Sequence, residues 1–340
     1  MKRKVLMGMA GFAVFLSIGI SKMSCAQTIN GAGATFPAPI YKKWFQTYHD
    51  QNPSVTFNYQ AVGSGAGIAL YKQGTVFFGA TDAAMTDADL STTQPTLHIP
   101  TVAGAVVMIY NVPGVGPGLK LSGEVIADIY EKKITSWNDP RIQRDNRGVN
   151  IPPTPIIVVH RADSSGTSFI FTGYLSAVSP SWRSGPGIGK SVSWPVGIGG
   201  NANAGVAGLV AHQPGAIGYA ELAYALQSRL QFAQVKNKAG NFVEASIASV
   251  TAAADAGAGR MKNDVRVSIV NEAGKNTYPI SGFTYLLVPK NPKDKAQGRA
   301  LVNFVKWAMG PGQAEAAALN YAPLPKSVAA INEHALGGVR

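Results

Sequence analysis

Cysteine is nearly missing from this sequence, because Cys25 is the only one among 340 residues. No disulfide bond can therefore form within the chain, and stability has to come from a packed core. Charged residues are also scarce, at 14%, whereas apolar residues make up 46%. This balance excludes a disordered chain and a solvated coiled coil. The 38 glycines and 21 prolines argue against a helical bundle, so we expect a globular α/β fold of about two domains.

Long apolar runs are missing too, apart from one at residues 5–20. Basic residues at positions 2–4 precede this run and the small residues Ser24 and Ala26 follow it, which is the layout of a secretory signal peptide. A transmembrane anchor is the weaker interpretation, since about 20 apolar residues are needed to span a bilayer. We expect residues 1–26 to be a signal peptide cleaved near Ala26, and the mature protein to be exported to the periplasm.

The position of Cys25 raises the alternative of lipidation. A lipoprotein peptidase would have to cut directly before this residue, and Lys22 stands where such a site normally has an aliphatic residue. The sequence therefore favours ordinary cleavage near Ala26 over lipidation at Cys25.

Positive charge is in excess, but it is not concentrated. Removal of residues 1–26 takes away four basic residues and no acidic ones, which lowers the formal net charge from +12 to +8. Lysine and arginine are spread along the mature chain without blocks of five or more, so we expect no nucleic-acid partner. A diffuse positive field favours the capture of anions instead.

Strand and helix patterns alternate along the chain, which predicts parallel strand pairing. Asp87 is predicted to cap a short helix. Residues 182–208 are rich in glycine, serine and asparagine and are predicted to form long loops. The predicted strands are 55–59, 76–80, 101–110, 156–160 and 283–288, and the predicted helices begin after 36, after 67 and at 122, 171 and 301.

Four loops place small, donor-rich residues between a strand and the start of a helix. They are residues 33–36, residues 63–65, residues 81–82, and Arg161 together with residues 165–167. A helix N-terminus presents unpaired N–H groups, and glycine allows an oxyanion to approach the backbone closely. Ligands of open α/β sheets bind at the carboxyl ends of the strands. These loops therefore predict one anion-binding pocket.

Each loop also has a purely structural interpretation. The glycine-rich loop has Ile68 where a dinucleotide fingerprint needs glycine, and no P-loop lysine follows it. Ser165 and Thr167 fit helix caps, and so does Asp82. Arg161 is harder to explain in this way, because a guanidinium after four apolar residues needs a partner such as Asp163 or a bound anion.

Four motifs carry a resemblance to a known family. Residues 31–39 (GAGATFPAP), 79–83 (GATDA), 161–169 (RADSSGTSF) and 214–219 (PGAIGY) resemble the phosphate-binding proteins of bacterial high-affinity phosphate ABC transporters. The resemblance covers residues 29 to about 328. It implies a periplasmic-binding-protein fold, in which two α/β domains with mixed sheets are joined by hinge strands and the ligand lies in the interdomain cleft. The implied division is 27–101 and 279–340 for the first domain and 102–278 for the second.

The resemblance also implies a function without catalysis. Such a protein captures inorganic phosphate outside the cytoplasm and delivers it to the membrane permease subunits of the transporter. No cofactor or metal is expected, and we expect a monomer. The phosphate-binding residues that it implies are Thr35, Phe36, Ser64, Asp82, Arg161, Ser165, Gly166 and Thr167, with Asp163 holding the guanidinium of Arg161. The chain departs from the family pattern at Gly65, Thr81 and Ser164.

The implied ligand set is chemically consistent with phosphate. Phosphate keeps a proton near neutral pH, so its site needs an acceptor as well as donors, and an ionised carboxylate only accepts. Asp82 would be that acceptor. Sulfate lacks the proton and would be repelled by the carboxylate.

An exported phosphatase is the main alternative, with Ser64 or Ser165 as nucleophile and Asp82 as base. No G-x-S-x-G pattern surrounds either serine. The five histidines are scattered without the spacing of metal ligands, and His160, next to Arg161, is expected to be a core or rim residue. The sequence therefore favours a binding protein.

Overall fold

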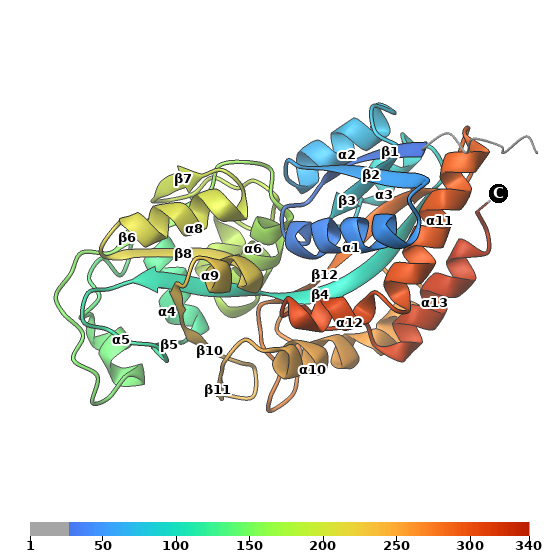
Figure 1. Cartoon of the computed structure of the whole chain (residues 1–340). Coiled ribbons are helices and arrows are strands. Elements are labelled where there is room, and N and C mark those ends of the chain that lie inside the picture. The colour runs from blue at the N-terminus through green and yellow to red at the C-terminus, as the bar shows by residue number, and fades with distance from the viewer. Residues whose placement is uncertain (1–26, 340) are drawn as a thin grey trace, which may run out of the picture.

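A long strand runs through both halves of this molecule and joins them (Figure 1). The computed structural model describes residues 27–339, so the predicted signal peptide, with Lys22 and Cys25, lies outside the described residues. The joining strand is β4 (Thr96–Asn111). We call the half that contains both ends of the described chain the first lobe, and the other half the second lobe.

The first lobe is formed by two separate parts of the chain. Its first part contains β1 (Gln27–Gly33), α1 (Ala38–Gln51), β2 (Val55–Ala61), α2 (Ser64–Lys72), β3 (Phe78–Thr81) and α3 (Asp87–Ser91). Its second part contains β12 (Ser281–Pro289), α11 (Lys295–Met309), α12 (Gln313–Ala318) and α13 (Lys326–Leu336).

The second lobe lies between these two parts in the sequence. It contains β5 (Lys120–Leu121), α4 (Gly123–Tyr130), α5 (Pro140–Asp145), β6 (Ile157–Arg161), α6 (Gly166–Val178), α7 (Pro180–Ser184), β7 (Ile198–Gly200), α8 (Ala202–His212), β8 (Ala216–Glu221), α9 (Leu222–Gln227), β9 (Gln231–Phe232), β10 (Gln234–Lys236) and β11 (Phe242–Val243). The chain then returns through α10 (Ile247–Ala258) and a 3₁₀ turn (Gly259–Lys262), and α10 packs against β4 and β12.

One mixed sheet extends through both lobes in the order β2-β1-β3-β12-β4-β8-β6-β7. The first part of β4, up to Ala105, pairs antiparallel with β12, and the rest, from Val106, pairs antiparallel with β8. The expectation of parallel pairing therefore holds for β1 with β2 and β3 and for β6 with β7 and β8, but not for β4 and β12. The division of the chain at 101/102 and 278/279 remains a prediction, while the partner of β4 changes at 105/106.

Pro100 lies inside β4, where a proline would normally interrupt pairing. The register of β4 with β12 shifts at this point: Tyr285 lies opposite Pro100 and Thr284 opposite Val102. Thr101 is therefore the extra residue of a bulge, and its hydroxyl donates to the carbonyl of Thr284 (3.3 Å). The bulge explains why the strand begins at Thr96, earlier than predicted.

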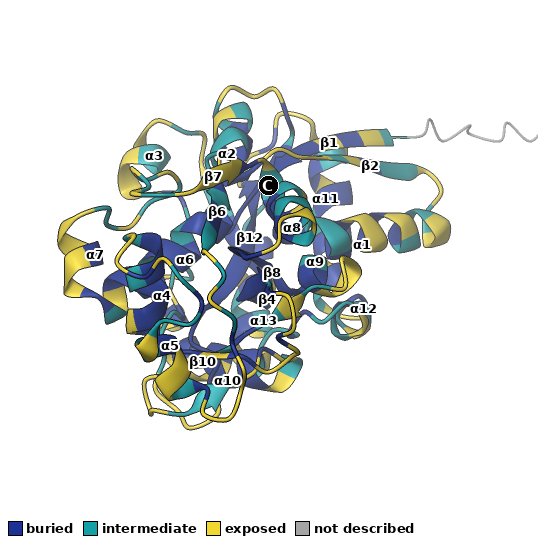
Figure 2. Cartoon of the chain, turned by 90° about the vertical axis from the view of Figure 1, so that its left-hand side faces the viewer, coloured by how far each residue is buried: buried dark blue, intermediate teal, exposed yellow. Residues whose placement is uncertain are grey.

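Aromatic side chains fill the core of the first lobe. Helix α1 buries a face that includes Trp44 and Phe45, and Phe45 stacks on Phe57 of β2 with ring centroids 5.1 Å apart. Phe304 of α11 closes the cluster, 4.6 Å from Phe57. Buried residues occupy the sheet and the inner helix faces, and exposed residues lie on the outer helices and loops (Figure 2). In the part of the chain that the structure describes, no helix is long and apolar enough to span a membrane.

Two local predictions are wrong. Residues 182–208 are not loops throughout, because β7 and the first half of α8 lie within this segment. The many glycines and asparagines of this segment favoured a loop in the prediction. The segment nevertheless contains a short strand and a helix whose buried residues are Asn203, Val206, Ala207 and Val210. The cap of α3 is Thr86 and not Asp87: the Thr86 hydroxyl accepts from the Asp89 N–H (3.1 Å), and Asp87 is the first helical residue.

Candidate functional site

The four predicted loops meet where the two lobes face each other. Each loop follows a strand of the mixed sheet: β1, β2 and β3 in the first lobe, and β6 in the second. The eight sequence-predicted site residues Thr35, Phe36, Ser64, Asp82, Arg161, Ser165, Gly166 and Thr167 are all buried in this region. The topology thus brings together residues that are more than 130 positions apart.

Asp82 presents the carboxylate of the site. It is 5% exposed, and its Oδ1 accepts from the Thr284 hydroxyl (2.8 Å). The hydroxyl of Ser64 lies 3.4 Å from Oδ2 and also accepts from the Asp82 N–H (3.1 Å). Burial raises the pKa of Asp82 to about 7, although the hydrogen bond from Thr284 and the charge of Arg161 oppose this rise. Asp82 caps no helix, since the α-helix that follows it is capped by Thr86.

Gly166 brings the second lobe into contact with Asp82. A Cβ atom added to Gly166 would lie 2.5 Å from Asp82 Oδ2 and would also collide with the Ser64 hydroxyl. The neighbouring Gly65 N–H donates to the carbonyl of Ser164 (2.9 Å). The loops of the two lobes therefore touch directly, and the structure is a closed form.

Arg161 contributes a buried positive charge at the end of β6. It is 3% exposed, and its Nε donates to Asp163 Oδ1 (2.7 Å) while Nη2 donates to Oδ2 (2.5 Å). Its Nη1 points the other way, to the Thr167 hydroxyl (3.3 Å). Burial acts to raise the pKa of Asp163, but the hydrogen bond and charge of Arg161 outweigh it and hold this pKa below the ordinary value. Asp163 thus fixes the guanidinium, as predicted from the sequence.

Thr35 and Phe36 form the turn between β1 and α1. The Thr35 carbonyl accepts from the Tyr224 hydroxyl (2.7 Å), and the Phe36 carbonyl accepts from the Tyr321 hydroxyl (2.7 Å). The ring of Phe36 lies against Gly104, where a Cβ atom would collide with it. Both residues are held by backbone and ring contacts, which leaves the Thr35 hydroxyl directed at the second lobe.

Ser165 has the structural role that the sequence left open. It is the N-cap of α6, and its hydroxyl accepts from the Ser168 N–H (3.0 Å). The N-terminus of α6 therefore begins at the site, with Gly166 and Thr167 in its first turn. Positive helix ends of this kind stabilise anions.

Sequence reasoning missed several residues of the site. Asn203 and Thr284 bond directly to predicted site residues, and the Tyr219 hydroxyl accepts from the Arg161 N–H (3.1 Å). Asn203 lies in the segment predicted as loop, and Thr284 lies inside a strand. Neither has a local pattern that distinguishes it from an ordinary polar residue. His160, in contrast, is half-buried and stacks on Trp194 with ring centroids 4.9 Å apart.

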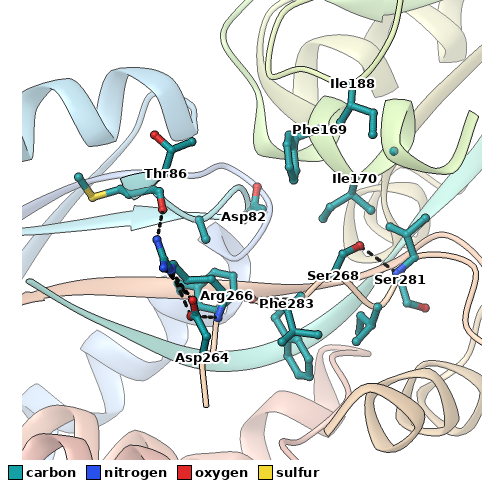
Figure 3. A pocket seen from close by; sticks show the side chains of 18 of the residues that line it. Asp82, Thr86, Phe169, Ile170, Ile188, Asp264, Arg266, Ser268, Ser281 and Phe283 are labelled. Carbon is teal, nitrogen blue, oxygen red and sulfur yellow. Dashed lines mark hydrogen bonds and ion pairs between the residues drawn. The ribbon is translucent and has the colours of Figure 1, made fainter. Parts of the chain in front are cut away.

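A pocket of about 610 Å³ adjoins the site beside Asp82. Figure 3 shows Asp82 and Thr86 across from the apolar side chains Phe169, Ile170 and Ile188. The charged residues that line the pocket are Asp82, Asp87, Asp264 and Arg266. The pocket is therefore lined by residues of both lobes and includes Asp82 in its wall.

Apart from Asp82, the charged residues that line this pocket are paired with one another. Arg266 donates to Asp264 (2.7 Å) and to Asp87 (2.7 Å), and also to the carbonyl of Met85 (3.1 Å). These bonds tie residues 264–266 to the loop that follows β3. The guanidinium of Arg266 thus bonds to two carboxylates, whereas that of Arg161 bonds to one and directs its Nη1 to Thr167.

Comparisons with known proteins identify the family of this chain. A family model described as a PBP superfamily domain matches residues 22–311. The phosphate-binding protein PstS of Pasteurella multocida is 44% identical over 304 residues, which cover 89% of this chain and 88% of the relative. The PstS of Xylella fastidiosa (strain Temecula1) is 41% identical over 301 residues, covering 88% and 82%.

A solved structure shows the same fold. It is a high-affinity periplasmic phosphate-binding protein (PfluDING) bound with phosphate, and it superimposes with a TM-score of 0.72 over 91% of this chain and 93% of its own, at 22% identity. At that identity the likeness concerns the fold alone, while the curated relatives establish the family. The chain belongs to the PBP superfamily and, within it, to the family of PstS phosphate-binding proteins.

Proposed function

We propose that this protein captures inorganic phosphate between its two lobes and delivers it to the membrane permease subunits of an ABC transporter. The observation that carries the proposal is the composition of the site. One buried carboxylate, Asp82, lies among hydroxyls, a helix N-terminus and the Nη1 side of the buried Arg161 guanidinium, which is the side that Asp163 does not contact. Such a site offers many donors and one acceptor, which is the complement of a phosphate that keeps one proton.

We assign the contacts to the residues that the sequence predicted. Thr35, Ser64 and Thr167, the amides of Phe36 and Gly166, and the Ser165 hydroxyl, which accepts from the Ser168 N–H and keeps its own proton, are the neutral donors. Arg161 supplies the charge-assisted bond. Asp82 accepts the proton of the phosphate. Because residues of both lobes take part, binding is coupled to the closure of the cleft.

A binding role is favoured over a phosphatase. Ser165 uses its hydroxyl to cap α6, and the relatives with 40% identity or more are named as phosphate-binding proteins. We further propose that residues 1–26 direct export to the periplasm and that Cys25 is removed with them.

Isothermal titration calorimetry with phosphate, sulfate and arsenate tests the proposal. We expect one phosphate to bind per chain, with sulfate at least about 100-fold weaker because of the repulsion from Asp82. A matched titration after EDTA treatment is expected to give the same affinity. Absence of phosphate binding, or steady release of phosphate from an ester such as p-nitrophenyl phosphate, would contradict the proposed role.

A further inference from the structure

Asn203 joins the two lobes inside the site. It is the second residue of α8 and is fully buried (0% exposed). Its Nδ2 donates to the hydroxyl of Thr35 in the first lobe (2.8 Å) and to the hydroxyl of Thr167 in the second (3.1 Å). One amide group therefore contacts two of the threonines assigned to phosphate, one from each side of the cleft.

The orientation of this amide is fixed by the backbone of β8. Asn203 Oδ1 accepts the N–H of Glu221 (2.9 Å), a group that can only donate. Turning the amide around would place two donors against each other. The NH2 group of Asn203 is therefore the end that faces Thr35 and Thr167, and both of its protons are used.

This orientation determines what the two hydroxyls can do. A hydroxyl has one proton and two lone pairs. The Thr167 hydroxyl accepts from Asn203 and also from Arg161 (3.3 Å), so both of its lone pairs are occupied. The Thr35 hydroxyl accepts from Asn203 as well. Each hydroxyl is left with its proton to give to another acceptor.

We propose that Asn203 is a positioning residue, which orients the hydroxyls of Thr35 and Thr167 so that both donate to the bound phosphate. It acts through the threonines rather than on the ligand. This inference rests on the proposed function and adds a residue to it. Because Thr35 belongs to the opposite lobe, the bond from Asn203 also stabilises the closed form.

The start of α8 is itself held in place by the site. Ala202 has a φ of 60°, a left-handed conformation that is rare outside glycine. Its N–H donates to Asp163 Oδ1 (3.1 Å), the same atom that accepts from Arg161 Nε. Asp163 thus holds both the guanidinium of Arg161 and the start of the helix that carries Asn203. The same carboxylate therefore positions a charged donor of the site and the residue that orients two of its hydroxyls.

A purely structural role is the alternative, and the chain provides a control for it. Asn146 is buried in the second lobe (5% exposed), its Oδ1 accepts the Lys120 N–H (2.7 Å), and its Nδ2 donates to the carbonyls of Lys120 and Ile142 (both 2.8 Å). It has the same bonding pattern as Asn203 but lies away from the site. Asn146→Asp therefore measures how much stability and phosphate affinity are lost when a carboxyl group replaces a buried side-chain amide away from the site.

The test compares Asn203→Asp, Asn203→Ala and Asn146→Asp with the wild type by phosphate calorimetry. In Asn203→Asp the hydroxyls turn to donate to the new carboxyl group, and phosphate affinity should fall by about 100-fold or more. Asn203→Ala leaves the hydroxyls free to rotate and should weaken binding by about tenfold. Asn146→Asp should bind within about twofold of the wild type.

Thermal unfolding in phosphate-free buffer separates folding from binding. Circular dichroism should show that the Asn203 variants are folded at the temperature of the titration. If Asn203→Asp is unfolded at that temperature, the binding comparison uses Asn203→Ala alone. Binding by both Asn203 variants within about twofold of the wild type would overturn the inference while leaving the proposed function intact. Equal losses in Asn203→Asp and Asn146→Asp would overturn it too. A wild type that binds no phosphate would remove the proposed function and this inference together.

Discussion

Gly166 approaches Asp82 so closely that a Cβ atom on Gly166 would lie 2.5 Å from the Oδ2 atom of that carboxylate. The two residues belong to opposite lobes. The closed form therefore requires a residue without a side chain, glycine, at the first position of α6.

Gly166→Ala should prevent full closure without disturbing either lobe. A steric cost of about 2–3 kcal/mol should weaken phosphate binding about 30- to 150-fold. Small-angle scattering should show less compaction on addition of phosphate than for the wild type. The control is Gly208→Ala in α8, where an added Cβ meets no atom within 4 Å. If Gly166→Ala bound phosphate as tightly as Gly208→Ala, the contact with Asp82 would have no role in closure.

Asp82→Asn should alter selectivity more than affinity. Asparagine keeps an oxygen that can accept from Thr284, but it replaces the negative charge with an NH2 donor. Sulfate is then no longer repelled, so the phosphate-to-sulfate affinity ratio should fall by at least about tenfold. Competition titrations on the wild type and the variant measure this ratio. An unchanged ratio would show that Asp82 is not the selective acceptor.

The same substitution should change how stability depends on pH. Burial raises the pKa of Asp82 from 3.8 to about 7, so the folded state holds a proton that the unfolded state has lost. The carboxyl group therefore costs stability progressively as pH rises from about 4 to 7, by an amount on the order of 4 kcal/mol above pH 7. In phosphate-free buffer, Asp82→Asn should unfold at a higher temperature than the wild type at pH 8 and at nearly the same temperature at pH 4. A difference that does not grow with pH would contradict this assignment.

Asp163→Ala should be strongly destabilising, because it leaves the buried guanidinium of Arg161 without its carboxylate. The expected loss is about 3 kcal/mol in the free energy of unfolding, measured by denaturant titration without phosphate. Glu272→Ala is the control, since it removes the partner of the exposed Arg260. Exposed pairs contribute about 0–1 kcal/mol. Similar losses in the two variants would mean that Arg161 finds another partner or reaches solvent.

Local patterns in the sequence were sufficient for most of the elements that carry the site. The apolar runs before Thr81 and Arg161 predict buried strands, and polar residues at their ends predict the ligand edge. These signals come from burial and from turn chemistry, which act over a few residues. The predicted roles of the site residues in binding phosphate remain predictions.

Residues that join the site from distant elements left no such signal. Thr284 meets Asp82 only because β12 pairs with β3, and Asn203 meets Thr35 only because the lobes are closed. Helix α8 was missed because Asn203 and the glycines and valines of this segment lower its helix propensity, while packing on β8 stabilises it. Contacts between distant segments decide these features, and no window of the sequence contains them.

The position of β12 in the sheet has a consequence for the order in which the molecule is assembled. This strand lies between β3 and β4, which do not pair with each other, yet it is residues 281–289 of the chain. Until β12 has been synthesised, β3 and β4 each keep an unpaired edge. In the sequence, the whole second lobe separates these two strands from β12. Such late, long-range pairing slows folding and leaves strand edges open to association with other chains. The same β4 that links the lobes in the finished protein is therefore, with β3, one of the two strands whose pairing in the first lobe waits for β12.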